Sequence, residues 1–378
     1  MNTLLKKYLI LTLILLLVFM PNLSLAETEE PISPEDSIPT EFAKGEVVEI
    51  ISQEYNKDYG AGLLFDYQEV KVKITSGPFK GEIITIENTT TGNPAYDIWV
   101  SEGDKVLLIL EILAGGIFNG YIADFQRDTY IYVLIVLFIL LLILIGAKQG
   151  LKSVFTLGIT VLVIAKGMLP LLFAGYNPVL LALLTGIIVT TFTLFIIGGV
   201  SKKTVAAVLG TAGGLLVSAF IAIFIGKLAN LQGLSGEEAQ MLLYIPQNVE
   251  FDFQGLLFAG IIIGALGAVM DVSMSIASAL EEINAVATDI SLKKLMKSGM
   301  NVGKDIMGTM SNTLILAYTG TSIPLFLLFM AYEQPFIKLI NMEFLAVEFV
   351  RAISGTIGLI LAIPITTVIA AFLMYKKT

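Results

Sequence analysis

The sequence predicts an α-helical polytopic membrane bundle of about seven transmembrane helices, preceded by a small all-β, OB-like domain outside the cytoplasm. Three observations predict this fold class. Hydrophobic residues make up 56% of the 378 residues, and the mean hydropathy is +0.83. Apolar runs of about 20 residues, the length that crosses a bilayer, recur in the last two thirds of the chain. Before them, apolar and polar residues alternate with the period of two that is typical of strands.

The beginning of the chain has the pattern of a secretory signal peptide, residues 1–26. Lys6 and Lys7 precede an apolar run at residues 9–19, and residues 24–26 form a small-residue cleavage site. The alternative is an uncleaved anchor helix, although the apolar run is short for a membrane span. In both cases the segment that follows is expected outside the cytoplasm.

Residues 27–42 are rich in proline and glutamate and have little to bury, so they are predicted to form a flexible linker. Residues 43–125 are predicted to form the β-domain. Valine and isoleucine alternate with lysine and threonine at residues 70–75, and turn sequences follow at residues 76–78 and 102–104. About five short strands fit into this range, which predicts a small barrel or sandwich.

Composition excludes several kinds of chemistry. The chain has no cysteine and no histidine, so disulfides, thiol nucleophiles, Cys/His zinc sites and Ser-His-Asp triads are absent. The net charge is −9, but residues 27–128 hold 20 acidic and 7 basic side chains, whereas residues 129–378 hold 12 and 14. This acidic domain argues against nucleic acid as a partner.

Trp99 in the β-domain is interpreted as part of the core rather than as a ligand surface. No cofactor is expected for this chain.

The helical domain is predicted at residues 126–378, and its apolar runs are long enough to cross a bilayer. The seven predicted spans are residues 129–147, 151–174, 178–198, 204–225, 256–279, 306–331 and 348–374.

The connections between these spans alternate in lysine content. The lysine-rich connections hold Lys148, Lys152, Lys202, Lys203, Lys293, Lys294, Lys297, Lys304, Lys376 and Lys377. The other side holds Lys227 and Lys338, with Arg127 beside the first span. The lysine-rich side is therefore predicted to be cytoplasmic, which places the C-terminus in the cytoplasm and agrees with an exported β-domain.

A carboxylate inside the fifth span is the leading candidate for a functional site. Asp271 lies in a stretch of apolar and small residues, where a charge costs about 2.5–3.5 kcal/mol on insertion scales. Ser275 lies one turn away on the same face, and Thr309 and Asn312 share a face of the sixth span at a similar depth. These four residues are predicted to form a polar cluster between the two spans. The alternative is that the serine, threonine and asparagine only hold helices together.

Four further charged residues are secondary candidates. Asp305 lies near the membrane surface, where a charge at a helix N-terminus is the simpler explanation. Lys166 and Arg351 form a second, outer level. Three arrangements stay open there: a local ion pair between Glu348 and Arg351, a cationic lining for an anion, and a bridge from Lys166 to Glu348.

Small residues and an amphipathic segment complete the pattern. Gly260, Gly264 and Gly267 are predicted to let neighbouring helices approach closely. Lysines lie opposite leucines in residues 291–300, which predicts a helix on the cytoplasmic membrane surface.

Three segments carry a family resemblance: GALGAVMDVSMSIASAL at residues 264–280, SGMNVGKDIMGTMSNTL at 298–314 and GYNP at 175–178. They resemble the YibE/F-like family of bacterial multi-pass membrane proteins, and the resemblance covers nearly the whole chain after the leader. It implies a protein of the bacterial cytoplasmic membrane, with an exported β-domain as in the long members. Shorter members resemble the bundle alone, which implies a paired shorter subunit or a homo-oligomer. The resemblance brings no assigned activity, substrate or catalytic residue.

Three function classes are compared. The first is a permease or a component for ion or small-solute transport, with Asp271, Ser275 and Asn312 as a proton or cation site. The alternative is a non-transporting envelope scaffold whose exported β-domain binds a partner. An intramembrane aspartyl enzyme using Asp271 and Asp305 is disfavoured, because no protease motif surrounds them and Asp305 is superficial. The sequence does not determine whether the protein binds a metal ion. The lipid bilayer is the expected partner of the helical domain.

Overall fold

The computed structural model describes residues 38–58, 64–113, 116–245, 249–287, 289–333 and 335–375. The predicted signal peptide, most of the predicted linker and the last two lysines lie outside the described residues. The described chain divides into two compact units, one ending at Leu141 and the other beginning at Leu142.

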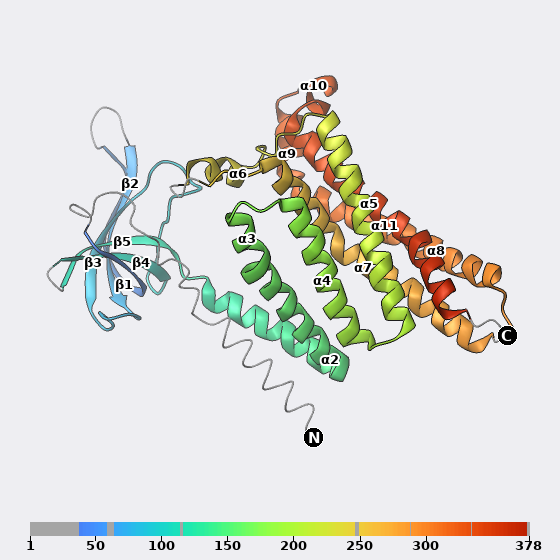
Figure 1. The fold of residues 1–378 in the computed structure, drawn as a ribbon. Coiled ribbons are helices and arrows are strands. Elements are labelled where there is room, and N and C mark those ends of the chain that lie inside the picture. Colours follow the sequence, from blue (N-terminus) through green and yellow to red (C-terminus); the bar gives the residue numbers. More distant parts are fainter. Residues whose placement is uncertain are drawn as a thin grey trace. The chain divides into compact units, whose positions relative to one another are not determined.

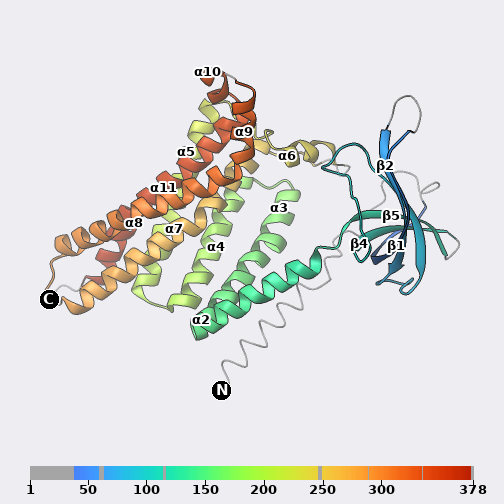
Figure 2. The ribbon, with the colours of Figure 1, turned by 180° about the vertical axis from the view of Figure 1, so that it is seen from behind.

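The first unit is a curved antiparallel sheet in the order β3-β2-β1-β4-β5 (Figures 1 and 2). Its strands are β1 (Thr40–Asp58), β2 (Leu64–Ile74), β3 (Ile83–Thr89), β4 (Lys105–Leu113) and β5 (Gly116–Phe125). The two edge strands approach each other, because a Cβ added to Gly120 of β5 would lie 2.8 Å from the Ile84 Cδ1 of β3. The sheet is therefore a half-barrel, which confirms the all-β, OB-like prediction.

The alternation of apolar and polar side chains in β2 determines which face of this sheet is buried. Val70, Val72 and Ile74 are fully buried, while the lysines between them are partly or fully exposed. Trp99 is half-buried and stacks on Tyr55, with 5.0 Å between the ring centroids. The interpretation of Trp99 as core therefore holds only in part, since the core proper consists of aliphatic side chains.

The second unit consists of helices, of which α2 begins in the first unit (Figures 1 and 2). They are α2 (Asp128–Leu162), the π-helix η1 (Val163–Met168), α3 (Leu169–Phe173), α4 (Pro178–Gly198), α5 (Lys202–Leu228), α6 (Glu237–Met241), the 3₁₀-helix η2 (Leu242–Tyr244), α7 (Phe253–Val286), α8 (Leu292–Thr321), α9 (Ile323–Ala331), α10 (Phe336–Ile340) and α11 (Glu343–Met374).

Five of the described helical segments are long and apolar enough to cross a membrane, and the bent pair α8 and α9 supplies a sixth. The first of these segments, Asp128–Phe173, has 46 residues. It would be about 70 Å long if straight, more than twice the hydrocarbon thickness of about 30 Å. The helix reverses at Ala147 (φ 46°), since a Cβ added to Gly150 would lie 1.8 Å from the Leu142 carbonyl oxygen. This segment therefore contains two helices joined by a sharp turn.

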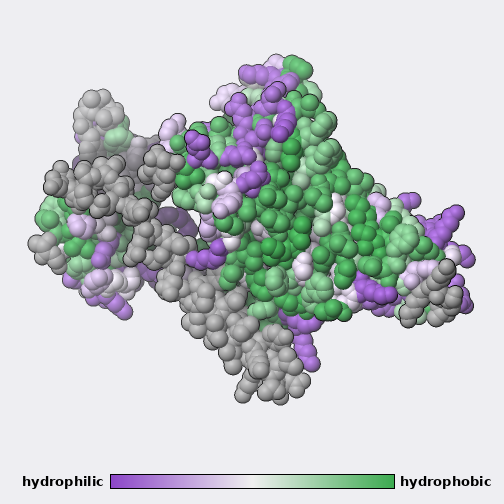
Figure 3. All heavy atoms as spheres, in the orientation of Figure 1, coloured by the Kyte–Doolittle hydropathy of each residue, from purple (hydrophilic) through white to green (hydrophobic). Residues whose placement is uncertain are grey.

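Polar contacts bring the lysine-rich connections to one end of the helical unit. Lys152 Nζ donates to the Ile197 carbonyl at 3.4 Å, and Lys203 pairs with Glu281 at 2.6 Å. A side-chain amide near the end of α7 donates to the last carbonyl of α11 at 3.2 Å. Figure 3 shows apolar side chains over much of the visible face of the helices, with hydrophilic side chains near their ends. This distribution is that of a bundle surrounded by lipid.

Small residues bring α5, α7 and α11 together in the centre of this unit. A Cβ added to Gly358 of α11 would lie 2.7 Å from the carbonyl oxygen of Gly214 in α5. Thr366 of α11 and Ser273 of α7 share a hydrogen bond of 3.2 Å between their hydroxyl oxygens, and both are fully buried. The polar contact in the centre thus involves hydroxyls and no charge.

Candidate functional site

The sixth predicted span is broken. The axes of α8 and α9 differ by 57°, and Ser322 lies between them. Pro324 stands in the first turn of α9, where it has no N–H to donate to the preceding turn. At the end of α8 the Ser322 backbone N–H donates to the Thr319 carbonyl at 3.1 Å, and the Ser322 hydroxyl donates to the Tyr318 carbonyl at 3.2 Å. The apolar run predicted as a span at residues 306–331 is therefore divided between two helices, because α8 ends before Ser322 and Pro324 begins a new first turn.

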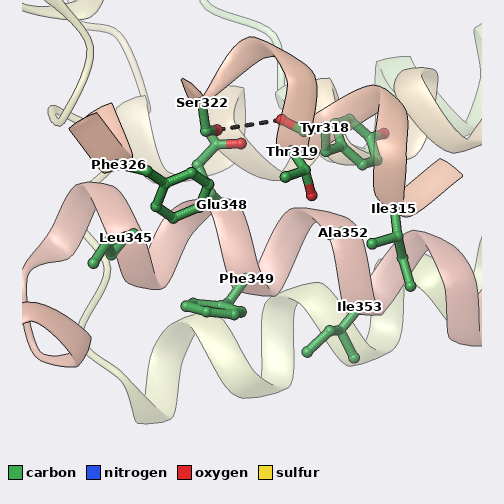
Figure 4. A pocket seen from close by; sticks show the side chains of 10 residues that line it. All are labelled: Ile315, Tyr318, Thr319, Ser322, Phe326, Leu345, Glu348, Phe349, Ala352 and Ile353. Atoms are coloured by element: carbon green, nitrogen blue, oxygen red, sulfur yellow. Dashed lines mark hydrogen bonds between the residues drawn. The ribbon is translucent and has the colours of Figure 1, made fainter. Parts of the chain in front are cut away.

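A cavity of about 250 Å³ lies beside this bend, between the bent span and α11 (Figure 4). Apolar side chains supply most of its lining. The lining residues are Ile315, Tyr318, Thr319, Ser322, Phe326, Leu345, Glu348, Phe349, Ala352 and Ile353.

Glu348 is the charged residue of this lining, and Figure 4 shows it extending from α11 toward the bend. Its Oε1 accepts a hydrogen bond of 2.7 Å from Arg351, one turn further along the helix. Both side chains are mostly covered, with 21% of Glu348 and 31% of Arg351 exposed. Glu348 Oε2 is buried and has no hydrogen-bond partner within the described residues, and the same holds for the Tyr318 hydroxyl.

This arrangement leaves one carboxylate oxygen free to accept a proton, a small cation or a hydrogen-bond donor. Arg351 orients the carboxylate through the other oxygen, as an ion pair within one helix turn does. A buried polar atom without a partner is unusual and calls for an explanation. Discontinuous membrane helices are also where secondary transporters build their ion and substrate sites.

The four residues of the predicted polar cluster lie at one level but are not enclosed. Asp271 and Ser275 are exposed on α7, and Thr309 and Asn312 are exposed on α8. Asp271 forms no hydrogen bond or ion pair with any described residue.

The relative level of the two helices follows from two contacts. Gly264 faces the Tyr318 hydroxyl, and Ile276 faces Gly303, so α7 and α8 run antiparallel. Interpolation between these contacts brings Asp271 to the level of about residue 309, at a rise of about 1.5 Å per residue. In the structure the four residues therefore lie at a similar level, whereas enclosure between the helices is not observed.

The direction of Asp271 follows from the helical period. Ser273 lies two residues away, which is about 200° around the helix. Its full burial against α11 therefore turns Asp271 and Ser275 to the outside. Spacing identified which residues share a face, but packing decided which face meets the core.

The secondary candidates also have defined positions. Lys166 lies in the π-helix, is exposed and has no ion pair with a described residue, so the bridge from Lys166 to Glu348 is not formed. The local pair of Glu348 with Arg351 is formed instead. Asp305 is exposed on α8.

The predicted packing glycines behave differently from one another. Gly264 faces Tyr318, with 2.4 Å from an added Cβ to the tyrosine oxygen. Gly260 and Gly267 face open space, with no atom within 4 Å of an added Cβ. The amphipathic segment at residues 291–300 is the beginning of α8 rather than a separate helix.

Sequence reasoning missed two parts of the site, Tyr318 and the bend at Ser322. The available signal was Pro324 inside an apolar run. Among the described residues there is no group of three or more acidic side chains placed to hold a metal ion.

Comparison with known proteins agrees with the two-unit organisation. Residues 134–376 match the family model of the YibE/F-like proteins, and residues 42–125 match that of the YibE/F family N-terminal domain. No curated protein and no solved structure shows significant similarity to the chain.

Proposed function

We propose that this chain, which belongs to the YibE/F-like family, is the membrane component of a transport system for protons or small cations. The carrying observation is a buried carboxylate oxygen without a partner, on a residue that lines a cavity beside a broken membrane helix. A carboxylate in hydrocarbon is costly, so a site that keeps one oxygen free favours function over structure alone.

The charge of the cavity favours a cation over an anion. Glu348 lines the cavity, whereas Arg351 donates to Glu348 Oε1 and is not part of the lining. A bound proton or cation would be met by the free Oε2 and by hydroxyl groups such as those of Tyr318 and Thr319. Hard cations prefer such oxygen ligands.

The orientation follows from the lysine-rich end, which we place in the cytoplasm. Glu348 lies five residues into α11, which begins at the opposite end. This distance is about 7.5 Å along the helix, so the cavity would lie in the outer half of the membrane. Asp271 would then lie deeper, where it offers a second proton or cation position.

The second candidate is an envelope scaffold, in which the β-domain binds a partner. Exposed aromatic side chains of the β-domain favour it, including Phe42 and Phe118 on strands and Tyr96 in a turn, at 67%, 61% and 76% exposure. Transport is preferred because a scaffold needs neither a broken span nor a cavity-lining carboxylate with one oxygen left without a partner.

The transport proposal predicts that water reaches the cavity. The chain has no native cysteine, so single cysteines report on their own positions. We expect Thr319→Cys and Ala352→Cys to react with a small water-soluble thiol reagent in native membranes. Ser354→Cys is the matched control, because Ser354 lies on α11 like Ala352, is buried and does not line the cavity. If both cavity positions stay unlabelled from either side, the cavity is dry and the proposal is wrong.

A further inference from the structure

The exposed side of α7 differs from the exposed sides of the other long helices. Between the lysines at its ends, the exposed residues of α5 are large and apolar, as Leu216, Phe220 and Phe224 illustrate at 53%, 65% and 51% exposure. In α7 no large hydrophobic side chain is exposed before Val286 at its end. The exposed residues between its first and last turns are instead Gly260, Gly264, Gly267, Asp271, Ser275 and, near the lysine-rich end, Glu282.

The neighbouring helix continues this surface. Exposed residues of α8 in the same part of the bundle include Asp305, Gly308, Thr309 and Asn312. Nothing lies within 4 Å of a Cβ added to Gly308, as for two of the exposed glycines of α7. We call these exposed residues, from Gly260 to Ser275 on α7 and from Asp305 to Asn312 on α8, the polar face. Its small residues would let another helix approach closely, and its polar groups are poorly matched to lipid.

Asp271 makes lipid an unfavourable cover for the polar face. Its carboxylate has no partner among the described residues and lies near the middle of a long apolar helix. Exposure to lipid would place its charge in hydrocarbon, which carries a large free-energy cost. A protein surface with hydrogen-bond donors at the same depth would remove most of that cost.

We propose that a second copy of this chain covers the polar face, with Asp271 of one copy against Asn312 of the other. The Asn312 amide forms no hydrogen bond with any described residue and can therefore donate. A two-fold axis along the membrane normal keeps each residue at its own depth and forms every contact twice.

The depths match in such a pair. Where α7 of one copy meets α8 of the other, Asp271 lies level with about residue 309, within one turn of Asn312. The same register brings Asp305 of one copy to the level of Ser275 of the other, so a second carboxylate meets a hydroxyl. Each acceptor on the polar face thus finds a donor on the same face of a second copy, which is the self-complementarity that a two-fold interface requires. This inference shares Asp271 with the transport proposal but does not depend on the Glu348 cavity, because no residue of the polar face lines that cavity.

The test is disulfide crosslinking between two copies with different tags, expressed together in membranes. One copy carries Gly267→Cys and the other Thr313→Cys, two exposed positions whose levels coincide. The control pair is Leu216→Cys with Phe220→Cys on the lipid-facing side of α5. On oxidation we expect a product with both tags, several-fold above the control pair.

Two results would overturn the inference. One is the lack of a mixed-tag product above control while both monomers accumulate at their normal level. The other is a crosslinked product that contains one tag and a different protein. As a further check, Gly260→Leu fills open space on the polar face and should remove most of the mixed-tag product. Unchanged crosslinking in that variant would also contradict the interface.

Discussion

Replacing Arg351 with methionine is expected to destabilise the helical unit by about 3 kcal/mol, at the low end of the cost of breaking a buried ion pair. The low end applies because 31% of Arg351 and 21% of Glu348 remain exposed. The single change leaves the Glu348 carboxylate without its hydrogen-bond donor or a neutralising charge. The double variant Glu348→Gln/Arg351→Met removes both charges and is expected to recover most of the loss, because replacing both partners of a buried pair is often neutral.

The measurement is thermal unfolding of the purified protein in detergent for Arg351→Met, for Glu348→Gln and for the double variant. Lys71→Met is the comparison for an exposed pair. Lys71 Nζ lies 2.7 Å from Glu49 Oε2, and the two side chains are 41% and 54% exposed. That change should cost at most about 1 kcal/mol. If the double variant is as unstable as Arg351→Met alone, the two charges are not coupled as described.

Gly358→Ala is expected to cost about 2–3 kcal/mol by overpacking. The added Cβ would lie 2.7 Å from the Gly214 carbonyl oxygen and equally close to the Ser218 Cβ. A backbone atom cannot turn away as the end of a long side chain can, so α5 and α11 would have to separate.

The matched control for this change is Gly167→Ala, where an added Cβ meets nothing within 4 Å. Alanine there should be neutral or stabilising by up to about 1 kcal/mol, because it lowers the conformational freedom of the unfolded chain. Equal melting temperatures for the two variants would show that the close crossing of α5 and α11 is not present.

The fold class could be predicted because its signals are local. Alternation at Val70, Val72 and Ile74 requires one face of a strand to be buried, and the structure buries that face completely. The apolar runs likewise depend on composition over about 20 residues and on nothing distant. The broken span was harder, because a proline in a membrane helix is tolerated in either a straight or a bent form.

The site could be predicted only in part, because its geometry depends on packing between helices. The local pair of Glu348 and Arg351 follows from their spacing of one turn. The free Oε2 atom and the cavity depend on how α9 turns away at Ser322. For Asp271, the periodicity gave its companions on the helix face but not the direction of that face. Full burial of Ser273 is a tertiary fact that sets this direction.

Cation flux through reconstituted protein tests the central claim most directly. Liposomes containing the full-length protein are given gradients of protons, Na⁺ and K⁺ in turn, and the flux of each ion is recorded. The account predicts flux above protein-free liposomes for at least one ion, its loss in Glu348→Gln, and its retention in Asp305→Asn, whose carboxylate is exposed away from the cavity. Equal flux in Glu348→Gln and the unmodified protein would contradict the assigned site, and absence of flux for all three ions would favour the scaffold.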